Sequence, residues 1–91
     1  MEIVFEYDKK KSLSNKCKHG IDFEEAKVLF YGKTVVIEAN EVNGEMRLMT
    51  IGEINNKHYS AIYTYRHKSI RLISVRRSRK NEEKIYEQNH S

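Results

Sequence analysis

The feature that most constrains this fold is a change of hydrophobic period just after Gly32. Four later segments alternate apolar and polar residues in the two-residue period of β-strands: residues 34–40, 45–54, 58–66 and 70–77. Short turns join them, and the first contains the pair Asn43-Gly44, which is typical of tight hairpins. Connections this short predict an antiparallel meander.

The residues before Gly32 predict a strand and two helices. Residues 2–7 read as a strand, and Asp8 is placed to cap a helix over residues 9–19, with Leu13 and Cys17 on one face. Gly20 ends that helix, because glycine accepts a positive φ without a Cβ clash. Asp22 and Glu25 have capping-box spacing at the start of the second helix. We expect its buried stripe to contain Phe23, Ala26, Val28, Leu29 and Phe30, before Gly32 closes it.

A last helix is predicted over residues 77–88, with residues 88–91 frayed. The expected fold is a single α+β domain over residues 1–91, long enough for one core. Its N-terminal strand and two helices pack on a curved antiparallel meander sheet, which a C-terminal helix follows. This arrangement leaves the other face of the sheet for a site.

Composition excludes several classes of protein. The single cysteine, Cys17, rules out an internal disulfide and a multi-cysteine zinc site. No set of histidines and acids has metal-ligand spacing, so no metal or other cofactor is expected and a metal-dependent nuclease is disfavoured. No apolar run is long enough to span a bilayer, which predicts a cytoplasmic protein without a membrane partner.

Charge is distributed in blocks. The net charge is +4, yet residues 9–21 contain five lysines and residues 66–80 contain seven cations, with no acid in either block. Two cationic blocks favour an anionic partner, nucleic acid first. The alternative is solvated surface, and for the run of lysines at 9–11 that is the plainer interpretation.

Strand phase singles out three arginines that share a face with apolar or small neighbours. Arg47 is in phase with Met49, Arg66 with Ile62, and Arg76 with Leu72 and Ser74. If the three converge, they form a phosphate pocket, because guanidinium binds phosphate oxygens bidentately. The alternative is a set of strand-end ion pairs with Glu38, Glu45 or Glu53, and periodicity does not separate the two. His19 ends a helix, where capping is the plainer role.

Four motifs stand out along the chain: Lys-His-Gly-Ile-x-Phe-Glu-Glu-Ala at 18–26, Gly-Glu-x-Arg at 44–47, Thr-x-Arg at 64–66 and Arg-x-Ile-Ser-x-Arg at 71–76. With these motifs, nearly the whole chain resembles the BrnT family, toxins of type II toxin–antitoxin pairs. The resemblance implies a RelE-like ribonuclease fold, RNA cleavage that blocks translation, and neutralisation by a BrnA-like antitoxin. It also implies that the toxin–antitoxin complex contacts operator DNA only through the antitoxin. Tyr7 and Glu83 depart from the family pattern, and Glu83 weakens any RNA contact by the last helix.

These observations give one hypothesis, a metal-independent endoribonuclease in which the ribose 2′-OH attacks the neighbouring phosphorus. Arg47, Arg66 and Arg76 would stabilise the phosphate, Glu45 or His19 would be the base, and His19 or Lys18 the acid. Further RNA-binding candidates are cationic: Lys16, Lys18, Arg71, Arg77 and Arg79. The alternative is a non-catalytic module that binds RNA or the antitoxin through the same fold.

Overall fold

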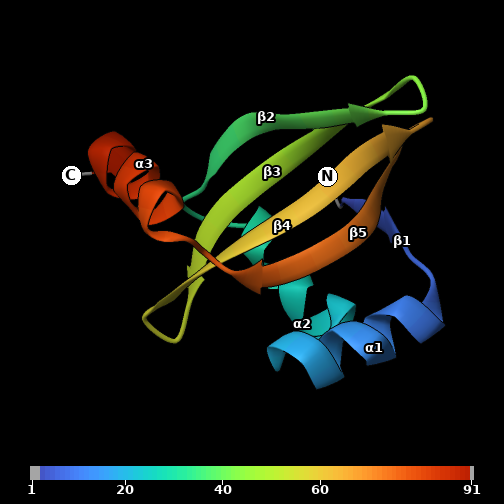
Figure 1. The fold of residues 1–91 in the computed structure, drawn as a ribbon, viewed down its shortest axis with the longest axis horizontal. Helices are drawn as coiled ribbons and strands as arrows, with labels where there is room; N and C mark the ends of the chain where they lie inside the picture. The colour runs from blue at the N-terminus through green and yellow to red at the C-terminus, as the bar shows by residue number, and fades with distance from the viewer. Residues whose placement is uncertain (1–2, 91) are drawn as a thin grey trace.

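The computed structural model describes residues 3–90. Its elements are β1 (Val4–Glu6), α1 (Lys9–His19), α2 (Phe23–Ala26), the 3₁₀ helix η1 (Lys27–Phe30), β2 (Val35–Val42), β3 (Glu45–Ile54), β4 (Lys57–Arg66), β5 (Ser69–Arg77) and α3 (Lys80–His90). The strands form one twisted sheet in the order β1-β5-β4-β3-β2 (Figure 1). The α+β class is confirmed.

The meander predicted from the short turns is confirmed for β2 to β5, which pair antiparallel in chain order. Asn43 and Gly44 both have positive φ, as do Asn55 and Asn56, which is the backbone that tight hairpins need. The periodicity did not predict how the first strand pairs. β1 runs parallel to β5, so the sheet is mixed.

The two faces of the sheet carry different helices. In Figure 1, α1 and α2 lie together at one side, and α3 stands apart beside β2. The first face holds the main core, in which Phe23 and Leu29 pack against Tyr63, Leu72 and other buried side chains. The second holds a smaller cluster of Met49, Ile51 and Tyr86. The face that carries α3 is therefore only partly covered.

The face that α1 turns inward is polar, and the face shared by Leu13 and Cys17 is the one that it turns outward. Leu13 is 69% exposed and Cys17 is exposed, whereas Ser12 and Asn15 are buried. Ser12 Oγ accepts a hydrogen bond from the backbone N–H of Phe23 at 2.9 Å. The helix packs on the rest of the protein by forming hydrogen bonds with backbone groups that would otherwise be unpaired. A pattern of apolar and polar residues in the sequence does not reveal such contacts.

The second predicted helix is two short pieces. The capping box is confirmed, because Asp22 accepts from the N–H of Glu25 and Glu25 accepts from that of Asp22. After one α-turn the chain tightens into η1, whose shorter period turns Val28 outward, where it is 52% exposed. Val28 is therefore not part of the buried stripe.

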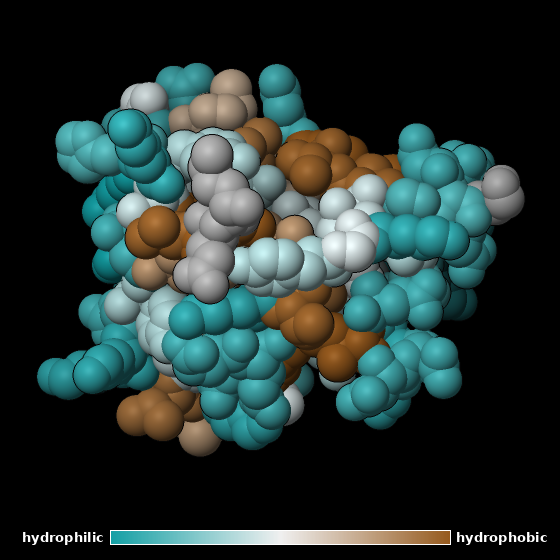
Figure 2. All heavy atoms as spheres, turned by 180° about the vertical axis from the view of Figure 1, so that it is seen from behind, coloured by the Kyte–Doolittle hydropathy of each residue, from teal (hydrophilic) through white to brown (hydrophobic). Residues whose placement is uncertain are grey.

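The last helix begins at Lys80 and continues to His90, so the fraying predicted for residues 88–90 is wrong; Ser91 lies outside the described residues. His90 Nε2 lies 3.0 Å from the carbonyl oxygen of Thr34, and its ring packs on Tyr86. These tertiary contacts order the last turn. Within residues 3–90 no helix is long and apolar enough to cross a membrane. Figure 2 shows a largely hydrophilic surface, broken by brown hydrophobic patches, on the side opposite Figure 1.

Candidate active site

A β-bulge in β5 decides which side chains reach the face that carries α3. Ile62 pairs with Ser74 and the next residue, Tyr63, pairs with Leu72, so Ile73 is an extra residue in β5. The bulge shifts the alternation of the strand by one. Leu72 and Val75 are therefore both buried in the core. Strand phase predicted that Arg76 shares a face with Leu72, and that prediction is wrong. Arg76 lies with Ser74 on the opposite face.

Arg47 and Arg76 both line a cavity of about 390 Å³ on that face, which we call the arginine hollow. Side chains from β2 to β5 and from the start of α3 line it, among them Arg47, Met49, Ile62, Arg76, Arg79 and Glu82. Its lining includes the apolar side chains of Met49, Ile62 and Ile73, and its charged lining has three arginines against one carboxylate. The hollow therefore suits an anionic ligand with an apolar portion.

Glu82 holds Arg76 in place. Its two carboxylate oxygens accept from the Arg76 guanidinium at 2.8 and 2.9 Å, and the Glu82 side chain is only 6% exposed. It also accepts from the Ser60 hydroxyl and from the backbone N–H of Arg79. Burial alone would raise the pKa of Glu82, but the hydrogen bonds from Arg76, Arg79 and Ser60 outweigh it and lower the pKa to about 2. The hydrogen bond to Glu82 likewise raises the pKa of Arg76.

Asn15 fastens α1 to the edge of β5. β1 pairs with β5 only as far as Arg71, so among residues 3–90 no strand continues along that edge. Asn15 takes the place of a strand there: its amide accepts from the N–H of Val75 at 3.2 Å and donates to the carbonyl of Val75 at 2.8 Å. The same amide donates to Ile21. The end of α1 is thereby held beside β5.

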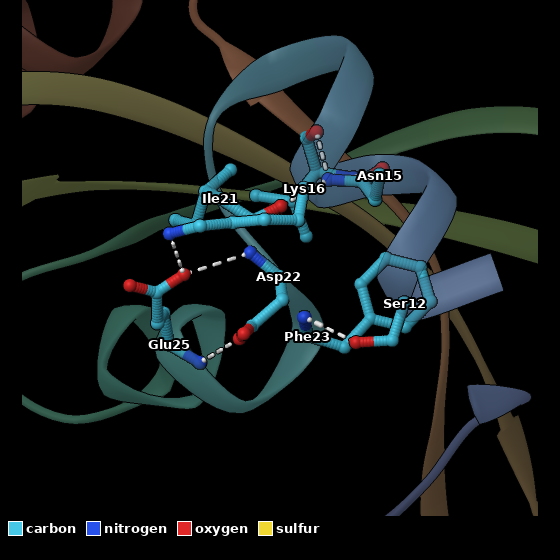
Figure 3. Close-up of polar contacts among 8 residues, drawn as sticks. Ser12, Asn15, Lys16, Ile21, Asp22, Phe23 and Glu25 are labelled. Carbon is cyan, nitrogen blue, oxygen red and sulfur yellow. Dashed lines mark hydrogen bonds and ion pairs between the residues drawn. The ribbon is translucent and has the colours of Figure 1, made fainter. Parts of the chain in front are cut away.

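This docking places the Lys-His-Gly motif, residues 18–20, beside β5. Gly20 ends α1 at φ +75°, and its N–H donates to the carbonyl of Lys16. Lys18 and His19 line a second cavity of about 180 Å³, the lysine hollow, with Lys11 and Asn15 of α1 and with Ile73 and Ser74 of β5. Lys16 points elsewhere and pairs with Glu25 at 2.8 Å, beside the capping box (Figure 3).

The other predicted site residues lie outside both hollows. Arg66 pairs with Glu45 at 3.2 Å where β3 begins and β4 ends, and neither side chain lines a hollow, so the predicted convergence of three arginines is wrong for Arg66. For that residue the strand-end ion pair is confirmed. Arg77 lies over the ring of Tyr59, next to the main core, and Arg71 pairs across from Thr64. Of the predicted RNA-binding residues, Lys18 and Arg79 line the hollows.

Sequence reasoning missed three residues of this region: Asn15, Ser74 and Glu82. Glu82 carried a usable signal, because a glutamate at the third position of a helix often returns to the backbone N–H that precedes it. Asn15 and Ser74 carried none, since their positions depend on the docking of α1 and on the bulge. No group of three or more histidine, cysteine, aspartate or glutamate side chains that could hold a metal occurs within residues 3–90.

Comparisons with known proteins agree with this fold. Residues 7–82 match the family model of the ribonuclease toxin BrnT of type II toxin–antitoxin systems. The structure is similar to the 1.1 Å crystal structure of the Brucella abortus ribonuclease toxin BrnT, with a TM-score of 0.67 and 24% identity. That match covers 87% of this chain and 100% of the Brucella chain. A search among curated protein sequences finds no significant match.

Proposed function

This chain belongs to the BrnT family of ribonuclease toxins, and we propose that it is a metal-independent endoribonuclease whose site spans the arginine hollow and the lysine hollow. The RNA 2′-OH attacks the adjacent phosphorus. The P–O5′ bond breaks as the new P–O2′ bond forms, which leaves a 2′,3′-cyclic phosphate and a free 5′-OH.

The observation that supports this proposal is the adjacency of the two hollows. Both are lined by Ile73 and Ser74, so the arginines of the sheet and the Lys18–His19 pair of α1 lie on either side of the same short segment. The reaction needs positive charge around a pentacoordinate phosphate and a nearby group that transfers protons. Arg47 and Arg76 supply the first requirement, and His19 supplies the second.

Of the groups that could transfer protons, His19 is the best placed. Glu82 lies in the arginine hollow, but a carboxylate with a pKa of about 2 is a weak base, and Arg76 already occupies both its oxygens. Glu45, two residues before Arg47 on β3, lines neither hollow and pairs with Arg66. We therefore assign proton transfer to His19, with Lys18 as the other candidate acid, and we assign Glu82 the positioning of Arg76.

The family also implies an antitoxin partner. We propose that the antitoxin is BrnA-like, that cleavage inhibits translation in the cytoplasm, and that operator DNA is contacted only through the antitoxin. We also propose that the fold is the RelE-like ribonuclease fold that the sequence resemblance implies.

The test is cleavage of an end-labelled RNA by the purified chain in excess EDTA, with analysis of the product ends. Arg47→Ala is the sharpest variant, because Arg47 forms no ion pair within residues 3–90. Its removal therefore breaks no ion pair that stabilises the fold. Removing a charge that acts on the transition state typically costs about 100-fold or more in kcat. Arg66→Ala is the matched control, a strand arginine that lies outside the hollows.

Cyclic-phosphate ends from the wild type and Arg66→Ala, with cleavage lost in Arg47→Ala, would support the proposal. Cleavage that requires added metal would contradict it. Salt-dependent RNA binding without products would favour the non-catalytic module instead.

A further inference from the structure

The bulge at Ile73 places Ser74 where the two hollows meet. Ile73 and Ser74 are the residues that line both, and Ser74 is the one with a polar side chain. Without the extra residue, strand alternation would turn Ser74 into the core beside Leu72. Bulges are frequent next to active sites, because they redirect a side chain in this way.

The Ser74 hydroxyl is available to a ligand. Ser12 and Ser60 use their hydroxyls on internal partners, respectively the Phe23 N–H and the pair Ser78 and Glu82. Ser74 is half-buried and makes no side-chain hydrogen bond within residues 3–90. A serine hydroxyl can donate to a phosphate oxygen and accept from a ribose hydroxyl.

The two hollows differ in a way that suits two parts of one strand. The arginine hollow, at about 390 Å³, has Met49 and Ile62 in its lining and the volume of a small-ligand pocket. The lysine hollow is smaller, at about 180 Å³, and its lining is mainly polar, with Lys11, Lys18 and His19. The first fits a nucleoside between arginines, and the second fits the sugar–phosphate that follows or precedes it.

We propose that a single RNA strand crosses β5 at Ser74, with neighbouring nucleotides in the two hollows. In this arrangement Ser74 Oγ donates a hydrogen bond to the phosphate that joins them. The inference rests on the proposed ribonuclease function and adds to it the path of the substrate and a substrate-contacting residue.

The experiment measures two quantities on the same variants. Binding is followed with a short 2′-O-methyl RNA, which cannot be cleaved because its 2′-OH is blocked, and cleavage with the matching RNA. The variants are Ser74→Ala and Ser74→Asp, with Ser69→Ala and Ser69→Asp as controls on the same strand and face but outside both hollows. Urea midpoints verify that all four fold.

Ser74→Ala should lower kcat/KM about tenfold or more, the usual effect of losing a hydrogen bond to a charged group. Ser74→Asp should lower affinity for the 2′-O-methyl RNA further, because its carboxylate faces the phosphate. Both Ser69 variants should behave like the wild type. Since one strand occupies both hollows, Arg47→Ala and Lys18→Ala should each weaken binding of the same oligonucleotide.

Ser74 variants that bind and cleave like the Ser69 variants would overturn the crossing while leaving the ribonuclease proposal intact. Ser74-dependent binding by a wild type that forms no product would support the crossing and contradict the ribonuclease. A wild type that binds no RNA would overturn both.

Discussion

Two arginine–glutamate pairs lie on the same face of the sheet and differ in almost every other respect. Arg76 and Glu82 form a bidentate contact at 2.8 and 2.9 Å, with side chains 20% and 6% exposed. Arg66 and Glu45 are 3.2 and 3.4 Å apart at their two contacts, with side chains 48% and 44% exposed. From strand phase alone, the two arginines looked equivalent.

The difference shows what tertiary structure adds to an ion pair. Around Glu82, Arg79 just before α3 brings a backbone N–H and β4 brings the Ser60 hydroxyl, in addition to the two hydrogen bonds from Arg76. Around Glu45 there is mainly solvent, which screens the charges and leaves little net stabilisation. We expect the first pair to support stability and the site, and the second to contribute little to either.

The largest expected effect is that of Glu82→Ala. It leaves the partly buried Arg76 without its carboxylate, so the free energy of unfolding should fall by about 3 kcal/mol or more. Glu45→Ala, at the exposed pair, should change it by less than about 1 kcal/mol. Urea denaturation of the two variants measures both values, and equal losses would contradict the distinction.

The next largest effect is expected in acid, where the Arg76–Glu82 pair should lose its contribution to the free energy of unfolding. The pKa of Glu82 falls from 4.5 to about 2 on folding, so its stabilisation is complete above pH 4.5 and is lost as pH falls toward 2. This shift corresponds to about 3 kcal/mol. Urea unfolding between pH 5 and 2 should show a smaller acid-induced loss for Glu82→Gln than for the wild type. An unchanged slope would contradict the assignment.

Asn15 should rank third. Asn15→Ala leaves the N–H and C=O of Val75 and the C=O of Ile21 without partners, which we expect to cost about 2–3 kcal/mol. The comparison at the other end of the sheet is Thr64→Val, which loses one hydrogen bond to Met46, worth about 1 kcal/mol. If Asn15 also holds the lysine hollow in place, cleavage by Asn15→Ala should fall at temperatures where the variant remains folded.

The smallest effect is expected for Arg66→Ala. With Arg66 outside both hollows, kcat/KM for RNA should fall by less than about fivefold, equivalent to about 1 kcal/mol. A loss as large as that of Arg47→Ala would return Arg66 to the catalytic group and would show that the substrate extends beyond the arginine hollow along β3 and β4.

Much of the fold was predictable because its signals are local. The cap at Asp8, the stop at Gly20, the capping box and the tight turns each depend on residues within a few positions, and the structure has all of them. The prediction failed for Val28, which was assigned to a buried stripe and is exposed. The inward residues of α1 are Ser12 and Asn15, whose hydrogen-bond partners are backbone groups of Phe23 and Val75, 11 and 60 residues away in the chain.

The candidate site divides in the same way. The sequence by itself determined the α+β class, the meander, the cationic blocks and the placement of Lys18 and His19 at a helix end, because these depend on period, capping and charge. Tertiary structure alone decided that Arg76 pairs with Glu82, that Asn15 completes the edge of β5, and that Ser74 lies between the hollows. Those features depend on a one-residue bulge and on contacts between distant segments. The two-residue period of the sequence predicts neither of them.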